Sequence, residues 1–184
     1  LLIYCVFGSS PDPVFGEKGM VVSTSKQASQ AGIQILKSGG NAIDAAVAVG
    51  FALAVTSSGN GNIGGGGFLV AYKKDGTTFT IDHREVAPSK SSKDMFLDDS
   101  GNVVPGKSLY TRAGSGVPGT VDGLIRAFED HGSGKLSLQE ILKPAIKLSE
   151  KGFYLSYYEA QRLNAYKSFF EKNKAAKKIF TRQD

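Results

Sequence analysis

Apolar residues recur at helical spacing in two neighbouring segments near the start of the chain. Over residues 27–37 they fall on one face of a helix, and Gly39-Gly40 is expected to end it. Asn41 then suits the N-cap of a second helix, with Asp44 three residues later to accept N–H groups of the first turn. The body of that helix, residues 45–55, is apolar on every side, so we expect it to be buried all round or nearly so.

Two short strands are predicted next. Residues 68–72 and 78–81 flank Asp75-Gly76, a dipeptide that favours a tight hairpin because both positions tolerate positive φ. The second strand places Arg84 just past its end.

Later segments return to helical periodicity. Residues 121–128 repeat apolar positions at i, i+3, i+4 and i+7, Ser137 and Glu140 form a capping box, and an amphipathic segment covers about residues 156–170. Helices, a hairpin and further helices follow one another without repeats. This order predicts an α+β layered fold rather than alternating βαβ units.

Composition suits one ordinary globular domain, or part of a larger one: 184 residues, 41% hydrophobic and 21% charged. The net charge of +5 is concentrated in residues 167–184, which contain six basic residues and two acidic ones, Glu171 and Asp184. A basic tail with few interleaved aromatics is typical of a solvated helix face. We therefore expect no nucleic acid partner.

Cysteine and histidine content excludes several kinds of site. Cys5 is the single cysteine, and His83 and His131 are the two histidines, so we expect no internal disulfide and no metal site. We also expect no cofactor. Residues 1–16 are interpreted as a possible signal-peptide remnant or disordered leader, and 17–184 as a portion of a larger protein. The apolar run 1–8 is too short to span a bilayer, and a buried strand is the alternative interpretation.

A glycine-rich segment suggests two alternatives. Residues 59–64 match G-x-G-x-x-G, but the segment leaves a helix and enters a strand, which is the reverse of a dinucleotide site. The four glycines that follow offer N–H groups and close approach, which suits either a tight turn or the wall of an active site. They are Gly64, Gly65, Gly66 and Gly67.

Arg84 is the candidate binding residue. Its planar guanidinium can hold a carboxylate through two hydrogen bonds. Asp82 and Glu85 flank it, and an arginine between two acids more often forms an ion pair. Local chemistry alone leaves both roles open.

Five segments in order resemble one family, the γ-glutamyltransferases. They include the buried-helix segment 40–48, the glycine run 62–68 and the Arg84 segment 82–88. Residues 94–97 and 116–121 complete the set. The similarity covers roughly residues 18–152 and becomes looser beyond.

This resemblance implies an N-terminal-nucleophile hydrolase fold, an αββα four-layer sandwich that is incomplete in this chain. It implies transfer of the γ-glutamyl group of glutathione to water, amino acids or peptides. In that family the precursor cleaves itself, and the N-terminal threonine of the small subunit attacks with its own amine as base. Arg84 would bind the α-carboxylate of the substrate, and the small subunit of the same precursor would be a partner.

Two departures from the family pattern matter. His83 stands where an aromatic or small residue is frequent, and the threonine nucleophile with its Thr-Thr-His-like context occurs nowhere in the sequence. We therefore assign no catalytic residue and expect the chain to be the N-terminal portion of the large subunit, inactive alone. The family resemblance also favours a periplasmic or secreted location.

Two alternatives remain. A related acylase or a poly-γ-glutamate-cleaving enzyme would share these motifs. The other is a non-catalytic module that keeps the fold and uses the basic tail on a polyanion.

Overall fold

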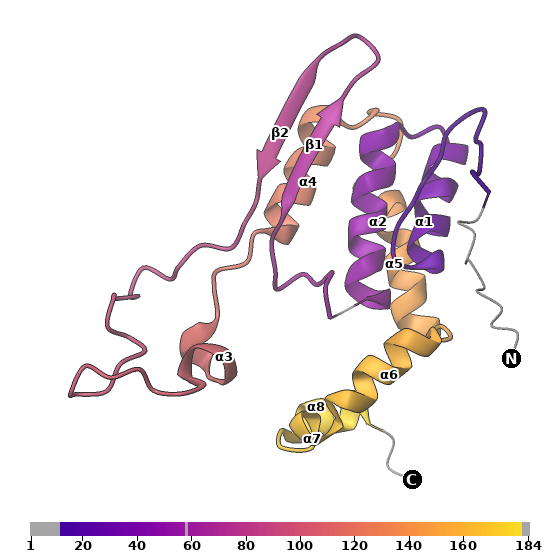
Figure 1. Cartoon of the computed structure of the whole chain (residues 1–184). Coiled ribbons are helices and arrows are strands. Elements are labelled where there is room, and N and C mark those ends of the chain that lie inside the picture. Colours follow the sequence, from indigo (N-terminus) through magenta and orange to yellow (C-terminus); the bar gives the residue numbers. More distant parts are fainter. Residues whose placement is uncertain (1–11, 58, 182–184) are drawn as a thin grey trace, which may run out of the picture.

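Three helices form the main layer of the protein. The computed structural model describes residues 12–57 and 59–181, and in it α1 (Lys26–Lys37), α2 (Ala42–Thr56) and α5 (Leu138–Lys151) lie side by side (Figure 1). Helix α2 contacts both of the others. The expectations for Cys5 and for residues 1–8 lie outside the described residues.

The predicted caps of α1 and α2 are present. Ser25 accepts a hydrogen bond from the Ala28 N–H at the start of α1, and Gly39 has φ +91° just after its end. At α2 the Asn41 side chain accepts from Ile43 and Asp44, and the Asp44 carboxylate accepts from the Asn41 N–H at 2.8 Å. The chain therefore turns between the two helices where its sequence predicts.

The interior of the helical layer is apolar and closely packed. Val47 and Ala48 of α2 are fully buried against Ile141 of α5 and Ile35 of α1. The expectation that residues 45–55 are buried all round or nearly so is confirmed, since Ala46 is the one exposed residue among them. Residues 18–22 line a cavity together with Ala42 and Ala46 on that side of α2.

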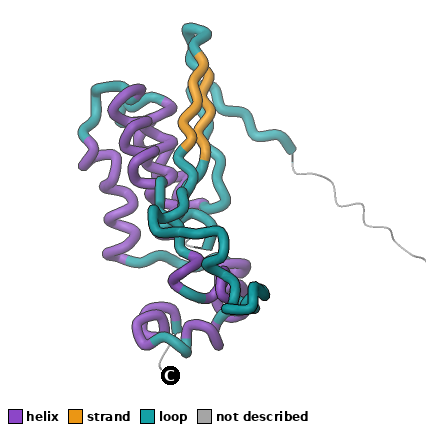
Figure 2. The backbone as a smooth tube through the Cα atoms, turned by 90° about the vertical axis from the view of Figure 1, so that its left-hand side faces the viewer, coloured by secondary structure: helices purple, strands orange, loops and turns teal. Residues whose placement is uncertain are grey.

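Strands β1 (Phe68–Tyr72) and β2 (Thr78–Asp82) form an antiparallel hairpin with Phe68 opposite Asp82. One face packs on the core through Leu69, Ala71, Phe79 and Ile81. The Phe79 ring stacks on His131 of α4 (Thr120–His131), with the ring centres 3.6 Å apart. The hairpin thus lies along α4 (Figure 1), and the perpendicular view shows the two strands beside the helices (Figure 2).

The hairpin turn differs from the expected tight turn. Lys73 donates to Thr77, Gly76 donates to Lys73, and Gly76 alone has positive φ, at +84°. This pattern is a three-residue turn with a glycine bulge, not a two-residue turn with both central residues at positive φ. Asp75 instead accepts a hydrogen bond from the Thr77 N–H at 2.9 Å, which holds it in an ordinary conformation.

The amphipathic segment 156–170 forms two helices rather than one. Helix α6 (Tyr157–Ala165) ends at Tyr166, where φ is −99° and ψ 6°, and α7 (Lys167–Phe170) follows. Helix α8 (Lys174–Phe180) then folds back, and the rings of Phe170 and Phe180 stack with centres 4.9 Å apart. This return contact replaces the continuous helix that periodicity alone predicts.

A long excursion separates β2 from α4. It carries α3 (Lys107–Tyr110) and the 3₁₀ turn η1 (Arg112–Gly114), and it extends away from the helices (Figure 1). The predicted α+β class is confirmed by helices that pack on a small antiparallel sheet. Across residues 12–57 and 59–181, no helix is long and apolar enough to cross a membrane.

Candidate functional site

Three segments that are distant in sequence meet at the base of the hairpin, and we call this place the crossing. They are residues 62–67, 83–86 and 116–120. His83 and Gly67 exchange both backbone hydrogen bonds, at 3.0 and 3.2 Å. Val86 and Val117 do the same, at 3.2 and 2.9 Å. The segment that carries Arg84 is therefore bonded through its backbone on both sides.

The first turn of α4 is tied to the glycine run. The N–H groups of Gly119 and Thr120 both donate to the Gly65 carbonyl, at 2.9 and 3.0 Å. The Thr120 hydroxyl donates to the Asn62 carbonyl at 3.2 Å. N–H groups at a helix start have no partner within the helix, so the glycine run satisfies them here.

The four predicted glycines are not equivalent. A Cβ on Gly66 would lie 2.5 Å from the His83 carbonyl oxygen and 2.7 Å from the Glu85 nitrogen, both backbone atoms. A Cβ on Gly65 would meet nothing closer than 3.4 Å. On Gly64 and Gly67 the nearest atoms, both in side chains, would lie at 3.1 Å. Gly66 is thus the position where only hydrogen fits beside the Arg84 segment.

The opposite side of that segment is also lined by glycine. A Cβ on Gly119 would collide with the His83 carbonyl, and one on Gly123 would collide with the His83 side chain. The imidazole Nδ1 is buried there and has no hydrogen-bond partner among the described residues. The backbone at His83 therefore runs between two walls that lack side chains.

Arg84 projects from the crossing toward solvent. Its side chain is 61% exposed, and its Nε lies 3.4 Å from Glu85. Its guanidinium also lies 5.8 Å from the centre of the Phe68 ring, and its backbone N–H donates to Asp82. In the described part of the chain no ion pair of its terminal amino groups is found. The Arg84 guanidinium is thus held by Glu85 and Phe68, and its terminal amino groups remain available to bind a carboxylate.

The residues on the α4 side of the crossing were not assigned a role from sequence. Residues 116–121 contribute to the family resemblance, but their sequence alone does not predict a structural role. Gly119 and Gly123 are four residues apart, which puts both on one face of a helix. That spacing beside a turn segment is the signal that would have indicated a close backbone approach.

The acidic side chains and His83 near the crossing do not form a metal-binding group. Residues 12–57 and 59–181 contain no group of three or more histidine, cysteine, aspartate or glutamate side chains arranged to hold a metal ion. The carboxyls with a lowered pKa lie in turns and a cap: backbone N–H groups of Thr77, Asn102 and Ser137 lower the pKa of Asp75, Asp98 and Glu140. The chemical group that the crossing presents is the Arg84 guanidinium, which can form two hydrogen bonds to a carboxylate and stands on a fixed backbone.

Comparison with known proteins points to one family. The sequence model described as Gamma-glutamyltranspeptidase matches residues 28–184. A glutathione hydrolase proenzyme from Escherichia coli (strain K12) is 49% identical over 156 residues, which are 85% of this chain and 27% of that protein. The chain spans less than a third of the length of such curated relatives.

Solved structures agree in shape as well as in sequence. The crystal structure of Helicobacter pylori gamma-glutamyltranspeptidase matches with a TM-score of 0.89 and 43% identity over 93% of this chain and 49% of that one. Cephalosporin acylase from Bacillus halodurans matches with a TM-score of 0.73 and 28% identity, over 90% of this chain and 31% of that one.

Proposed function

The chain belongs to the γ-glutamyltranspeptidase family, as its motifs predicted, and on this premise we propose that it is the substrate-holding part of a γ-glutamyltransferase. The enzyme transfers the γ-glutamyl group of glutathione to water, an amino acid or a peptide. The structures that match this chain confirm the expected N-terminal-nucleophile hydrolase fold. This chain contributes a helical layer and one hairpin to it.

Arg84 is the observation that supports the proposal most directly. Two glycine walls fix its backbone, and its exposed guanidinium is open on the side away from Glu85. We infer that the fork binds the α-carboxylate of the γ-glutamyl group and holds the γ-carbonyl at a set distance from the nucleophile. Such orientation lowers the entropy cost of the acyl transfer.

The attacking group belongs to another part of the enzyme in this proposal. The sequence holds no Thr-Thr-His-like segment, so the threonine nucleophile comes from the small subunit of the same precursor. The outer face of the hairpin supports a covering partner, because Phe68, Val70 and Tyr72 are between 68% and 79% exposed on it. A contiguous exposed apolar face of this kind is typical of a surface that another segment covers.

Substitution of Arg84 tests the proposal. In the full-length protein that carries this chain, we expect Arg84→Ala to raise KM for γ-glutamyl-p-nitroanilide about 10- to 100-fold, because a charge-assisted hydrogen bond contributes roughly 1.5–3 kcal/mol. Arg84→Lys keeps the charge but loses the fork, so its KM should fall between the two. Steady-state kinetics of the wild type and the two variants measure these KM values.

Two controls accompany that experiment. Arg126→Ala removes an exposed arginine on α4 and should leave KM unchanged. Butyryl-p-nitroanilide lacks the α-carboxylate, so its slow turnover should not respond to Arg84→Ala. An unchanged KM for the γ-glutamyl substrate in Arg84→Ala would show that Arg84 is not the carboxylate-binding residue. The 184-residue polypeptide alone should show no turnover.

A related acylase is the second candidate, favoured by the likeness to cephalosporin acylase. The two functions differ in what the acyl group must carry. A γ-glutamyltransferase requires the α-amino and α-carboxyl groups, whereas an acylase accepts an acyl chain without the amine. Faster turnover of glutaryl-p-nitroanilide than of its γ-glutamyl counterpart by the full-length protein would favour the acylase.

We also propose a periplasmic or secreted enzyme. The support is the apolar run 1–8 with small and polar residues after it, which resembles the end of a signal peptide. Cell fractionation of the full-length protein, followed by N-terminal sequencing of the mature form, tests this location.

A further inference from the structure

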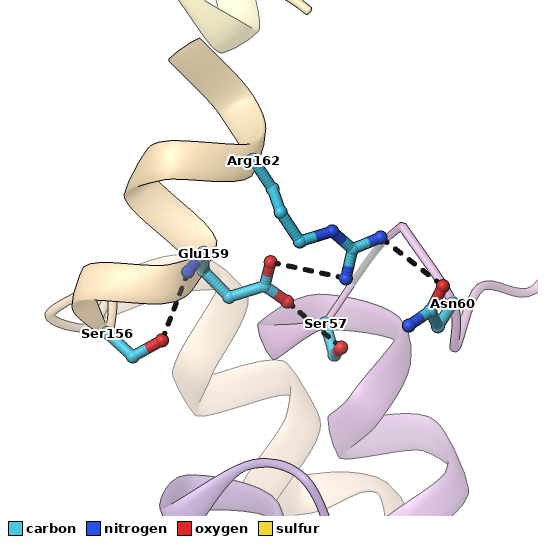
Figure 3. A network of polar contacts seen from close by, with 5 residues as sticks. All are labelled: Ser57, Asn60, Ser156, Glu159 and Arg162. Atoms are coloured by element: carbon cyan, nitrogen blue, oxygen red, sulfur yellow. Dashed lines mark hydrogen bonds and ion pairs between the residues drawn. The ribbon is translucent and has the colours of Figure 1, made fainter. Parts of the chain in front are cut away.

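A polar network joins α6 to the loop that leaves α2 and leads into the glycine run (Figure 3). The Ser57 hydroxyl donates to the Glu159 carboxylate at 3.0 Å, and the other carboxylate oxygen lies 3.7 Å from Arg162. The second amino group of Arg162 donates to the Asn60 side chain at 3.3 Å. Two side chains of α6 therefore hold two points of one loop, about a hundred residues away in sequence.

Ser57 is the anchor of that loop. Its residue is 5% exposed, and its carbonyl accepts hydrogen bonds from the N–H groups of Asn60 and Gly61, at 3.0 and 2.8 Å. Its hydroxyl meets Glu159, whose side chain is only 21% exposed. A hydrogen bond to a partly buried carboxylate is stronger than one between neutral groups, so this contact fixes the start of the loop.

Arg162 fits against the loop backbone. A Cβ on Gly59 would lie 2.5 Å from the terminal nitrogen of Arg162, so the guanidinium occupies the space that any other residue would fill. Gly61 returns to α2, where a Cβ would lie 2.9 Å from that of Leu53. The loop is thus clamped between the end of α2 and the side chains of α6.

The clamped loop continues directly into the crossing. The Asn62 carbonyl accepts from the Gly65 N–H and from the Thr120 hydroxyl, and the Gly65 carbonyl accepts from the start of α4. Gly66 then packs against the backbone at His83 and Glu85. A displacement of the loop at Asn60 would therefore reach the segment that carries Arg84 through a continuous series of backbone contacts.

We propose that Glu159 and Arg162 are positioning residues, which act through the loop to hold the glycine run in register with Arg84. This inference rests on the proposed function, because its consequence is the placement of the γ-glutamyl carboxylate. The two side chains do not touch the crossing themselves. Their loss should let residues 59–67 move and should weaken substrate binding more than it slows the chemical step.

The first test uses single substitutions in the full-length protein. Arg162→Ala and Glu159→Gln should each raise KM for γ-glutamyl-p-nitroanilide three- to tenfold and change kcat less than twofold. Arg162→Lys keeps a positive charge beside Glu159 but loses the hydrogen bond to Asn60, so its KM should lie between those of the wild type and Arg162→Ala. Gln161→Ala, an exposed neighbour on α6, is the matched control and should resemble the wild type.

A second test is specific to the geometry. Gly59→Ala should displace the Arg162 guanidinium and raise KM as Arg162→Ala does. Because both changes break one contact, the double variant should be no worse than the more impaired single variant. Effects that multiply in the double variant would overturn the proposal, since independent sites show additive free energies.

Hydrogen exchange gives a readout that does not depend on activity. Amides of residues 59–67 should exchange faster in Arg162→Ala than in the wild type, whereas those of α1 should not change. If the wild type lacks γ-glutamyl turnover, the proposed function fails, and faster exchange still supports the positioning role. If the wild type is active but neither KM nor exchange responds to Arg162→Ala, the positioning role is wrong and the function stands.

Discussion

The helical layer and the crossing are held together in different ways. In the layer, the side chains of α1, α2 and α5 make the contacts, and Val47 and Ile141 are completely buried. At the crossing the backbones make the contacts, through paired hydrogen bonds at His83 and Val86 and through glycines that carry no side chain. Most side chains there, including that of Arg84, stay exposed.

This difference separates stability from function in the molecule. A side-chain core stabilises the fold in proportion to its buried apolar area and tolerates substitutions of similar volume. A backbone crossing buries little apolar area, but it fixes a side chain in space with few ways to shift. Substitutions in the layer should therefore act first on stability, and substitutions at the crossing should act first on the substrate site.

The largest expected effect is on the core of the layer. Ile141→Ala should lower the free energy of unfolding by about 2–5 kcal/mol, because it removes buried methylene groups and leaves a cavity. Chemical denaturation of the full-length protein measures it. Ile146 is 46% exposed on the same helix, so Ile146→Ala should cost clearly less. Equal losses at the two positions would contradict the buried role of Ile141.

A smaller effect on stability, with a larger one on activity, is expected at the crossing. Gly66→Ala should lower the free energy of unfolding by roughly 1–3 kcal/mol, because its methyl group would press on the backbone at His83 and Glu85. It should also lower kcat/KM at least about tenfold, since Arg84 shifts with that backbone.

The neighbouring glycine supplies the control for that substitution. Gly65→Ala meets only ordinary contacts within the described residues, so the melting temperature should stay close to that of the wild type. Thermal unfolding and steady-state kinetics of both variants decide between a specific and a general need for glycine. Melting temperatures close to that of the wild type in both variants would show that the run tolerates a side chain at either place, and an equal loss in both would show a general need for glycine.

The smallest expected effect on stability is at the capping box of α5, which Ser137 and Glu140 form within a single turn. The pKa of Glu140 lies below its ordinary value of 4.5 because the backbone N–H and then the hydroxyl of Ser137 bind its carboxylate. A depressed pKa in the folded state stabilises the fold fully above pH 4.5, and this contribution is lost as the pH falls through the folded-state pKa.

Comparison of Glu140→Gln with the wild type isolates this term. The melting temperature of the variant should be lower at pH 7, and the difference should shrink as the pH falls below 4.5. A difference that stays constant from pH 7 to pH 3 would show that the charge of Glu140 has no part in the cap.

Short-range signals explain which parts of the fold were predictable. Both capping boxes, the end of α1 near Gly39 and the two strands follow from residues within four positions of one another. The break at Tyr166 does not follow from the periodicity, and beyond it the chain returns so that Phe170 meets Phe180, a contact that no local pattern predicts. The turn at Gly76 was assigned the wrong type because the Asp75 side chain binds the Thr77 N–H. An aspartate tolerates a positive φ, but nothing in the local sequence requires Asp75 to adopt one.

The two capping boxes show that a local sequence pattern does not predict its tertiary environment. Ser137 and Glu140 are exposed and serve only their own helix. Asp44 is completely buried and also accepts from the Ser133 N–H beyond α4, while the Asn41 amide donates to the His131 carbonyl. Both boxes have the same sequence pattern. Their environments differ because only one of them faces another helix end.

By itself, the sequence determined the family, the helices α1, α2, α4 and α5, both strands, and the position of Arg84 just after β2. The tertiary structure decided which glycine cannot be replaced, what fixes the Arg84 backbone, and that α6 reaches the loop before the glycine run. The physical reason is the range of the interactions. Caps and periodicity act within a few residues, whereas the crossing and the Arg162 network join residues 16 to 102 positions apart, which come together only when the chain has packed.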